Sequence, residues 1–290
     1  MAIFNEDGKK YYDRKIIELK TFDLDVLKNS DRVIVKDVIE KIGTISVTKK
    51  EQQSTDIDIN YLSRIFNLSL ADISIFGYDI TERVEDLIRI ISIKESKEGG
   101  WQNEILFPSA NLRTLDYKCT PGSIIYPTKS NNCDEVFLGH EEIHLLKDTN
   151  PEEFLLCYTL IEVIPIFYEL LMSEDIEYLS KDILSWRLSQ LKESGKEILR
   201  LTNLKGIAPQ SGKKYIDMAI MERSVYQLSF YYALILFNMY QTNPNRILYL
   251  VRCVLMHELT TLELLEELGI YNVRKSHHFD EGIEKVKTII

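Results

Sequence analysis

The stretch Gly139-His140-Glu141-Glu142-Ile143-His144-Leu145-Leu146 contains two histidines four residues apart, with a glutamate directly after the first. Residues i and i+4 lie on the same face of an α-helix, so a helix here would let both imidazoles bind one metal ion. The glutamate after the first histidine would then be placed to act on a water molecule at that ion. The stretch therefore predicts a helix that carries a zinc-peptidase motif, with its apolar residues packed in the core.

The composition is that of a globular protein, and it argues against several classes of function. Of the 290 residues, 45% are hydrophobic and 28% are charged, as in ordinary folded domains. The net charge of -10 argues against broad binding of nucleic-acid phosphates. No apolar run approaches the roughly 18 residues of a spanning helix, and residues 1–7 lack the pattern of a signal peptide. The four scattered cysteines form no C-x-x-C pair. We therefore expect a cytoplasmic protein with reduced thiols and with no nucleic-acid or membrane partner.

The spacing of apolar residues predicts a mainly helical fold. Helical periodicity marks residues 30–42, the stretch around 61–66, and a segment that Thr81 opens and that includes Ile91. It continues after the motif from residues 154 to 171 and again from 175 onward, with interruptions near Gly195, from Gly206 to Gly212 and at Asn243-Pro244. We expect a single catalytic domain over residues 1–290, with a helical lead-in lobe at 1–110 and a core at 111–290.

Residues 115–126 differ from this helical pattern. Leu115–Cys119 alternates in polarity, Pro121-Gly122 is a turn signal, and the next four residues favour strands. We therefore expect a small antiparallel or mixed β-sheet beside the motif helix. The open edge of a strand can bind an extended peptide, so the candidate substrate-binding residues are Ser123, Ile124, Ile125 and Tyr126. A purely structural hairpin is the alternative.

A catalytic zinc site needs a third protein ligand and an open position. Glu162 lies in an otherwise apolar run, where an unpaired carboxylate is costly, and metal ligation would explain it. Glu169 follows about two helical turns later on the same face. It is a candidate for holding a ligand histidine in place, or for being the third ligand itself. We prefer Glu162 because its surroundings are more apolar. The other histidines, in His257-Glu258 and His277-His278, complete no such motif.

These segments resemble the thimet oligopeptidase and oligoendopeptidase F family of zinc peptidases. The motif from His140 to His144 resembles the family's H-E-x-x-H, and Glu162 and Glu169 match the two glutamates of its third-ligand segment. Further likeness lies in Ser224–Tyr240, Asn243-Pro244 and Leu262–Ile270, so that the resemblance covers about residues 115–272. It implies a zincin-like core, in which a helix carrying the third ligand follows the active-site helix, with Zn²⁺ as cofactor and a peptide as substrate.

The chain departs from the family in its length and in one histidine. It is much shorter than typical members, so the large lobe around the family's substrate channel must be reduced or missing. The family steadies the oxyanion with a histidine and tyrosines on a late loop, but no histidine lies between His144 and His257. Tyr226 is the best-placed tyrosine, with Tyr231 and Tyr232 behind it. For each of these three, a role as a core aromatic is the alternative.

The sequence therefore predicts a zinc-dependent metallopeptidase. His140, His144 and Glu162 would hold Zn²⁺. Glu141 would serve as general base and then acid, and Tyr226 would donate a hydrogen bond to the oxyanion. One alternative is a zinc-binding regulatory protein of the same fold that has one protein target or no catalysis. The other is a metal-free helical interaction protein in which the motif arose by chance.

Overall fold

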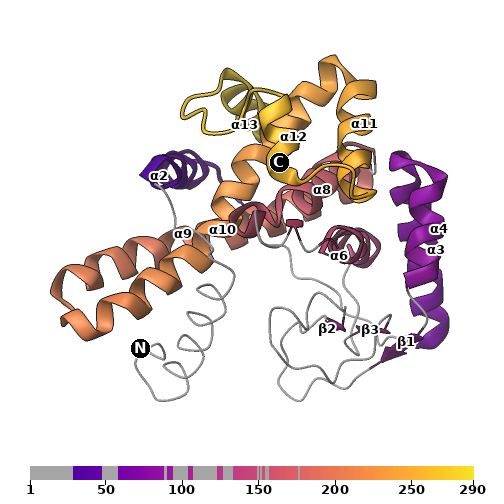
Figure 1. Cartoon of the computed structure of the whole chain (residues 1–290), viewed down its shortest axis with the longest axis horizontal. Helices are drawn as coiled ribbons and strands as arrows, with labels where there is room; N and C mark the ends of the chain where they lie inside the picture. Colours follow the sequence, from indigo (N-terminus) through magenta and orange to yellow (C-terminus); the bar gives the residue numbers. More distant parts are fainter. Residues whose placement is uncertain are drawn as a thin grey trace.

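The computed structural model of the chain describes residues 29–47, 58–87, 90–93, 104–106, 123–126, 133–148, 150, 152–153, 157–175 and 177–290. Most of these residues are helical (Figure 1). The helices are α2 (Asn29–Gly43), α3 (Ile59–Ile73), η2 (Ser74–Phe76), α4 (Tyr78–Leu87), α6 (Asp134–Asp148), η3 (Tyr158–Leu160), α8 (Val163–Asp175), α9 (Glu177–Ile207), α10 (Gln210–Thr242), α11 (Pro244–Leu255), α12 (Thr261–Glu267) and α13 (His277–Ile289).

Capping residues explain where several helices begin. The Asp58 side chain accepts a hydrogen bond from the backbone N–H of Tyr61 and caps α3. Asn243 ends α10 and caps α11, with Pro244 at the first helical position. Thr260 and Glu263 form a capping box at the start of α12. The predicted break at Asn243-Pro244 is therefore confirmed, because the two residues stop one helix and start the next.

The long helix α10 is the centre of the fold. It packs against α8, α9, α13, α2 and α11, and it crosses the middle of the molecule in Figure 1. From Gln227 to Phe237 every residue is buried, as expected for a helix covered by neighbours on all sides. A single cluster of buried apolar side chains extends from α2 to α13 through this helix. The motif helix α6 packs at one side of this core, against α8, α3, α4 and α11.

The predicted β-sheet is not found beside the motif helix. Every residue whose side-chain burial is described lies in a helix, turn or loop and not in a strand. The motif helix α6 packs on helices and not on a sheet. The expectation of a zincin-like core with a sheet beside the motif helix is therefore wrong. Three short backbone segments do pair, in the order β1 (Ile90–Ile93), β3 (Ser123–Tyr126), β2 (Glu104–Leu106). Because β3 is the middle strand, paired on both sides, it lacks the open edge that peptide binding would need.

Other helix predictions need smaller corrections. The helix expected to include Ile91 ends at Leu87, and Ile91 belongs to β1. Gly195 does not interrupt α9, because it lies inside the helix, where a Cβ would come within 3.1 Å of Ile39. The predicted strand at Leu115–Cys119 and the boundary between residues 110 and 111 lie outside the described residues. The division of the domain there stays a prediction.

The sequence predicted no membrane-spanning helix and reduced cysteine thiols. Among the described helices, none is both long and apolar enough to cross a membrane. Cys133, Cys157 and Cys253 are buried, and none of the three forms a disulfide among the described residues, while Cys119 lies outside those residues.

Candidate metal centre

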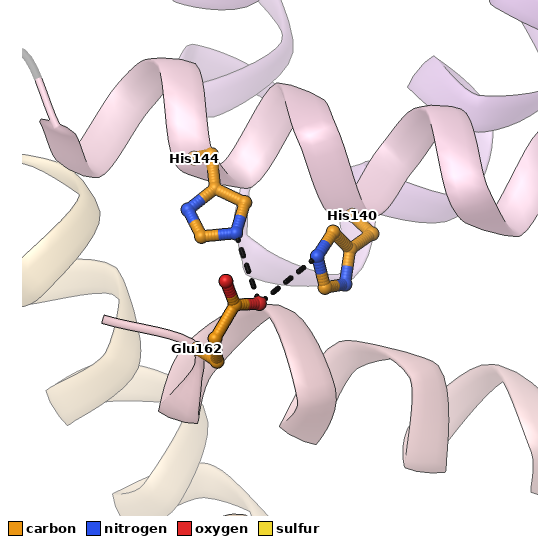
Figure 2. Close-up of side chains that lie close together, drawn as sticks. All are labelled: His140, His144 and Glu162. Carbon is orange, nitrogen blue, oxygen red and sulfur yellow. Dashed lines mark hydrogen bonds and ion pairs between the residues drawn. The ribbon is translucent and has the colours of Figure 1, made fainter. Parts of the chain in front are cut away.

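The two motif histidines lie on one face of α6 and point toward the start of α8 (Figure 2). Their ring centroids are 4.9 Å apart, and both side chains are almost fully buried. Ile143, Leu145 and Leu146 are completely buried in the core and hold this part of α6 in place. The i, i+4 spacing therefore places the imidazoles together, as the sequence predicted.

Glu162 approaches these rings from the beginning of α8. It lies in the turn directly before the helix, and its carbonyl oxygen accepts a hydrogen bond from the N–H of Ile166. The prediction of one continuous helix through Glu162 is therefore wrong, since η3 and a turn precede α8. This position suits a carboxylate, because the helix dipole favours negative charge at the N-terminus.

Three donor atoms converge between the helices with spacing that suits a metal ion. Oε2 of Glu162 lies 3.2 Å from Nε2 of His144 and 3.3 Å from Nε2 of His140. In a tetrahedral zinc site with bonds of about 2.0–2.1 Å, neighbouring ligand atoms lie roughly 3.3 Å apart. The three residues are 5–7% exposed, so water cannot fully solvate the groups. The donor set, its spacing and its burial therefore fit a zinc ion held by His140, His144 and Glu162.

The second nitrogen of His140 faces another acid. Its Nδ1 lies 2.8 Å from Oε1 of Glu169, which is 2% exposed. A proton on Nδ1, beside the Glu169 carboxylate, leaves the lone pair of the ring on Nε2, where a metal ligand needs it. Of the two glutamates, Glu162 thus lies beside the Nε2 atoms of both histidines, whereas Glu169 lies beside Nδ1 of His140.

Arg187 of α9 completes this arrangement, and the sequence analysis missed it. Its Nε donates to Oε2 of Glu169 at 2.8 Å, and its Nη2 donates to Oε1. The arginine is 3% exposed, and its guanidinium lies over the rings of Trp186 and Tyr226. A signal was available, because Arg187 interrupts the buried stripe of Leu184, Leu188 and Leu191. An unpaired cation in an apolar stripe is as costly as the unpaired carboxylate of Glu162 would be, so Arg187 also needs a buried partner.

Paired charges outweigh burial throughout the centre. Burial lowers the pKa of His140, but the carboxylates of Glu169 and Glu162 raise it to about 10. Burial raises the pKa of Glu162, but the two histidines hold it well below its usual range. Burial also raises the pKa of Glu169, whereas Arg187 and His140 lower it to about 2. The two carboxylates are therefore anionic. Arg187 balances the charge of Glu169, and a metal ion or a protonated His140 can balance the charge of Glu162.

The other predicted site residues differ in how exposed they are. Glu141 is partly exposed between its two buried neighbours on α6. Tyr226 on α10 is 39% exposed, and its ring centroid lies 5.8 Å from the Arg187 guanidinium carbon. Tyr231 and Tyr232 are buried core aromatics, with hydroxyls bonded to the backbone of Val273 and Asn272.

Other buried polar groups around α6 were not predicted as site residues. Glu142 is completely buried, accepts a hydrogen bond from Ser69, and has a pKa raised well above its usual range by burial. Tyr168 packs so closely on Gly139 that a Cβ there would lie 2.3 Å from its hydroxyl oxygen. The glycine before His140 thus permits the close approach of α8 to α6.

The C-terminal end of α6 is tied to the C-terminal helices. Lys147 is completely buried and pairs at 3.0 Å with Glu153, which also accepts the N–H of Thr261 at the start of α12. Nε2 of His257 lies 2.7 Å from the carbonyl oxygen of Leu146. His257, which begins the incomplete motif, therefore contacts the end of the motif helix and is not part of the metal centre.

One further group of potential ligands lies on the described surface. His277, His278 and Glu281 in the first turn of α13 have donor atoms within 4.8 Å of one another. His277 and Glu281 are exposed and His278 is partly exposed, so water can solvate them.

The likeness to the zinc peptidase family rests on the sequence segments alone. No protein-family model, curated protein or solved structure matches this chain.

Proposed function

We propose that this protein is a zinc-dependent metallopeptidase whose ion is held by His140, His144 and Glu162. The observation that carries the proposal is the convergence of two imidazole Nε2 atoms on one carboxylate oxygen, at 3.2 and 3.3 Å. This ligand set is the one implied by the likeness to the thimet oligopeptidase and oligoendopeptidase F family. We further propose a cytoplasmic location, on the grounds of the sequence.

The side chains around the centre divide the chemistry between them. A zinc ion bound there would supply a Lewis acid that polarises the substrate carbonyl and favours ionisation of water. Glu141 accepts a proton from the attacking water on its carboxylate and delivers it to the leaving amine. Tyr226 is the candidate hydrogen-bond donor to the oxyanion. Its hydroxyl would act beside Arg187, whose guanidinium carbon lies 5.8 Å from the tyrosine ring centroid. The Glu169 carboxylate keeps the proton of His140 on Nδ1, so that Nε2 remains free to bind the ion.

The proposal is tested by replacing the acid without disturbing the ligands. Glu141→Gln is expected to retain one zinc per chain and to lose hydrolysis of a peptide library. The matched control is Glu142→Gln on the buried side of the same helix. Burial raises the pKa of Glu142 well above its usual range and so favours the neutral acid, and an uncharged amide of the same shape should preserve zinc content and hydrolysis. Unchanged hydrolysis by Glu141→Gln would refute the role of Glu141.

Zinc content and peptide cleavage together separate the other candidate functions. His144→Ala is expected to lose zinc, as measured by elemental analysis of the purified protein. Stoichiometric zinc in the wild type without cleavage of any library peptide would favour a zinc-binding regulatory protein with one target or no catalysis. Absence of stoichiometric metal from the wild type would favour a helical interaction protein.

A further inference from the structure

The buried arginine behind the centre makes a two-point contact with Glu169. Nε and Nη2 of Arg187 bind the two carboxylate oxygens separately. Oε1, which accepts from Nη2, is also the oxygen that lies 2.8 Å from Nδ1 of His140. A planar guanidinium that holds both oxygens fixes the plane of the carboxylate as well as its position. Arg187 of α9 therefore fixes the direction in which Oε1 of Glu169 faces the His140 imidazole.

Three helices contribute to this chain of contacts. Arg187 comes from α9, Glu169 from α8 and His140 from α6. Arg187 is itself confined, because its guanidinium carbon lies 4.8 Å from the Trp186 ring centroid and 5.8 Å from that of Tyr226. All three charged residues are less than 10% exposed, so water competes little for their hydrogen bonds.

We propose that Arg187 is a positioning residue of the metal centre, which orients the His140 ring for zinc by holding the Glu169 carboxylate at two points. The inference rests on the proposed function, because it assigns His140 as a zinc ligand. Groups that orient ligand histidines typically change metal affinity by about 10–100-fold when they are removed. A positive charge alone would neutralise Glu169, but only a forked donor fixes its plane.

The test measures zinc affinity by competition with a chelator, together with thermal unfolding. Arg187→Lys keeps the charge but cannot make the planar two-point contact. It is expected to unfold near the wild-type temperature and to bind zinc about tenfold or more weakly. Arg187→Ala is expected to bind about 100-fold more weakly. The absorption spectrum of bound Co²⁺ should shift in both variants, because the ligand geometry changes.

Chemical rescue distinguishes positioning from a general loss of stability. Arg187 lines a cavity of about 410 Å³ together with Gln190, Ser194 and Tyr226, which offers a route for a small cation. Millimolar guanidinium should therefore restore much of the zinc affinity of Arg187→Ala, while the same concentration of sodium should not. If Arg187→Ala does not fold, Arg187→Lys alone decides the question through its affinity and its Co²⁺ spectrum.

The same helix provides a matched control. Arg200 on α9 makes the same two-point contact with Glu197, at 2.6 Å for both bonds, but on the protein surface. Arg200→Lys should leave zinc affinity and the Co²⁺ spectrum unchanged. Wild-type zinc affinity in Arg187→Lys would overturn the inference and leave the proposed function standing. A wild-type protein that binds no zinc would overturn both.

Discussion

Zinc binding is expected to release a proton from His140, because ligation and protonation compete for the same ring. The pKa of this histidine is about 10 in the metal-free protein, whereas an ordinary histidine titrates near 6.5. Zinc requires the deprotonated Nε2. The apparent affinity should therefore rise about tenfold for each pH unit between pH 7 and pH 9, and it should level off near pH 10.

Isothermal titration calorimetry in buffers of different ionisation enthalpy measures this effect directly. With a chelator to buffer zinc, the measurement at pH 7.5 should show about one proton released per zinc from His140. A ligand histidine with an ordinary pKa would instead give an affinity that is flat above about pH 7.5. A flat affinity from pH 7.5 to 9, without proton release, would show that the charges of Glu169 and Glu162 do not raise the pKa of His140.

The stability of the metal-free protein provides an independent check on the same pKa. Because the pKa of His140 is higher in the folded than in the unfolded state, its stabilising contribution is fully present below about pH 6.5. That contribution is lost as the pH rises through about 10. Urea unfolding should therefore show a loss of stability of the metal-free protein between pH 7 and pH 10. Glu169→Gln, which lacks one of the charges that raise this pKa, should show a smaller loss.

Three further substitutions test the packing around α6. Gly139→Ala should destabilise the protein, because a Cβ 2.3 Å from the Tyr168 hydroxyl oxygen costs about 1–3 kcal/mol. The higher helix propensity of alanine offsets at most about 1 kcal/mol of this cost, and a stabilised variant would contradict the observed contact. Tyr168→Phe should be neutral or stabilising in urea unfolding, because the hydroxyl is buried without a hydrogen-bond partner among the described residues; a loss above about 1 kcal/mol would show that the hydroxyl is satisfied. Lys147→Met should lower the free energy of unfolding by about 3–5 kcal/mol, because it leaves Glu153 buried without its cation, and an unchanged value would contradict that ion pair.

The sequence predicted the parts of the centre that depend on local spacing. His140 and His144 share a face because any helix places residues i and i+4 together, and the apolar residues around them made that helix predictable. Glu162 was found because an acid in an apolar run needs a partner. Arg187 obeys the same rule but lies 18 residues beyond Glu169, its partner. Only the packing of α9 on α8 shows that the two meet.

The sheet prediction failed for a related reason. Four β-favouring residues, Ser123–Tyr126, were assigned a place beside the motif helix from their composition and their position in the chain. In the structure α6 packs against α3 and α8 instead. The pattern of apolar residues within one short segment does not show which distant helix will cover it. Short apolar runs of this kind do not specify which element covers which face.

X-ray absorption spectroscopy of the zinc-loaded protein identifies the ligand atoms directly. We expect one zinc per chain, with two imidazole nitrogens at about 2.0–2.1 Å and carboxylate oxygen at about 2.0–2.2 Å. His144→Ala should abolish this spectrum, while Glu141→Gln should preserve it. A sulfur shell near 2.3 Å, or a zinc spectrum that survives in His144→Ala, would contradict the assignment of His140, His144 and Glu162 as the ligands.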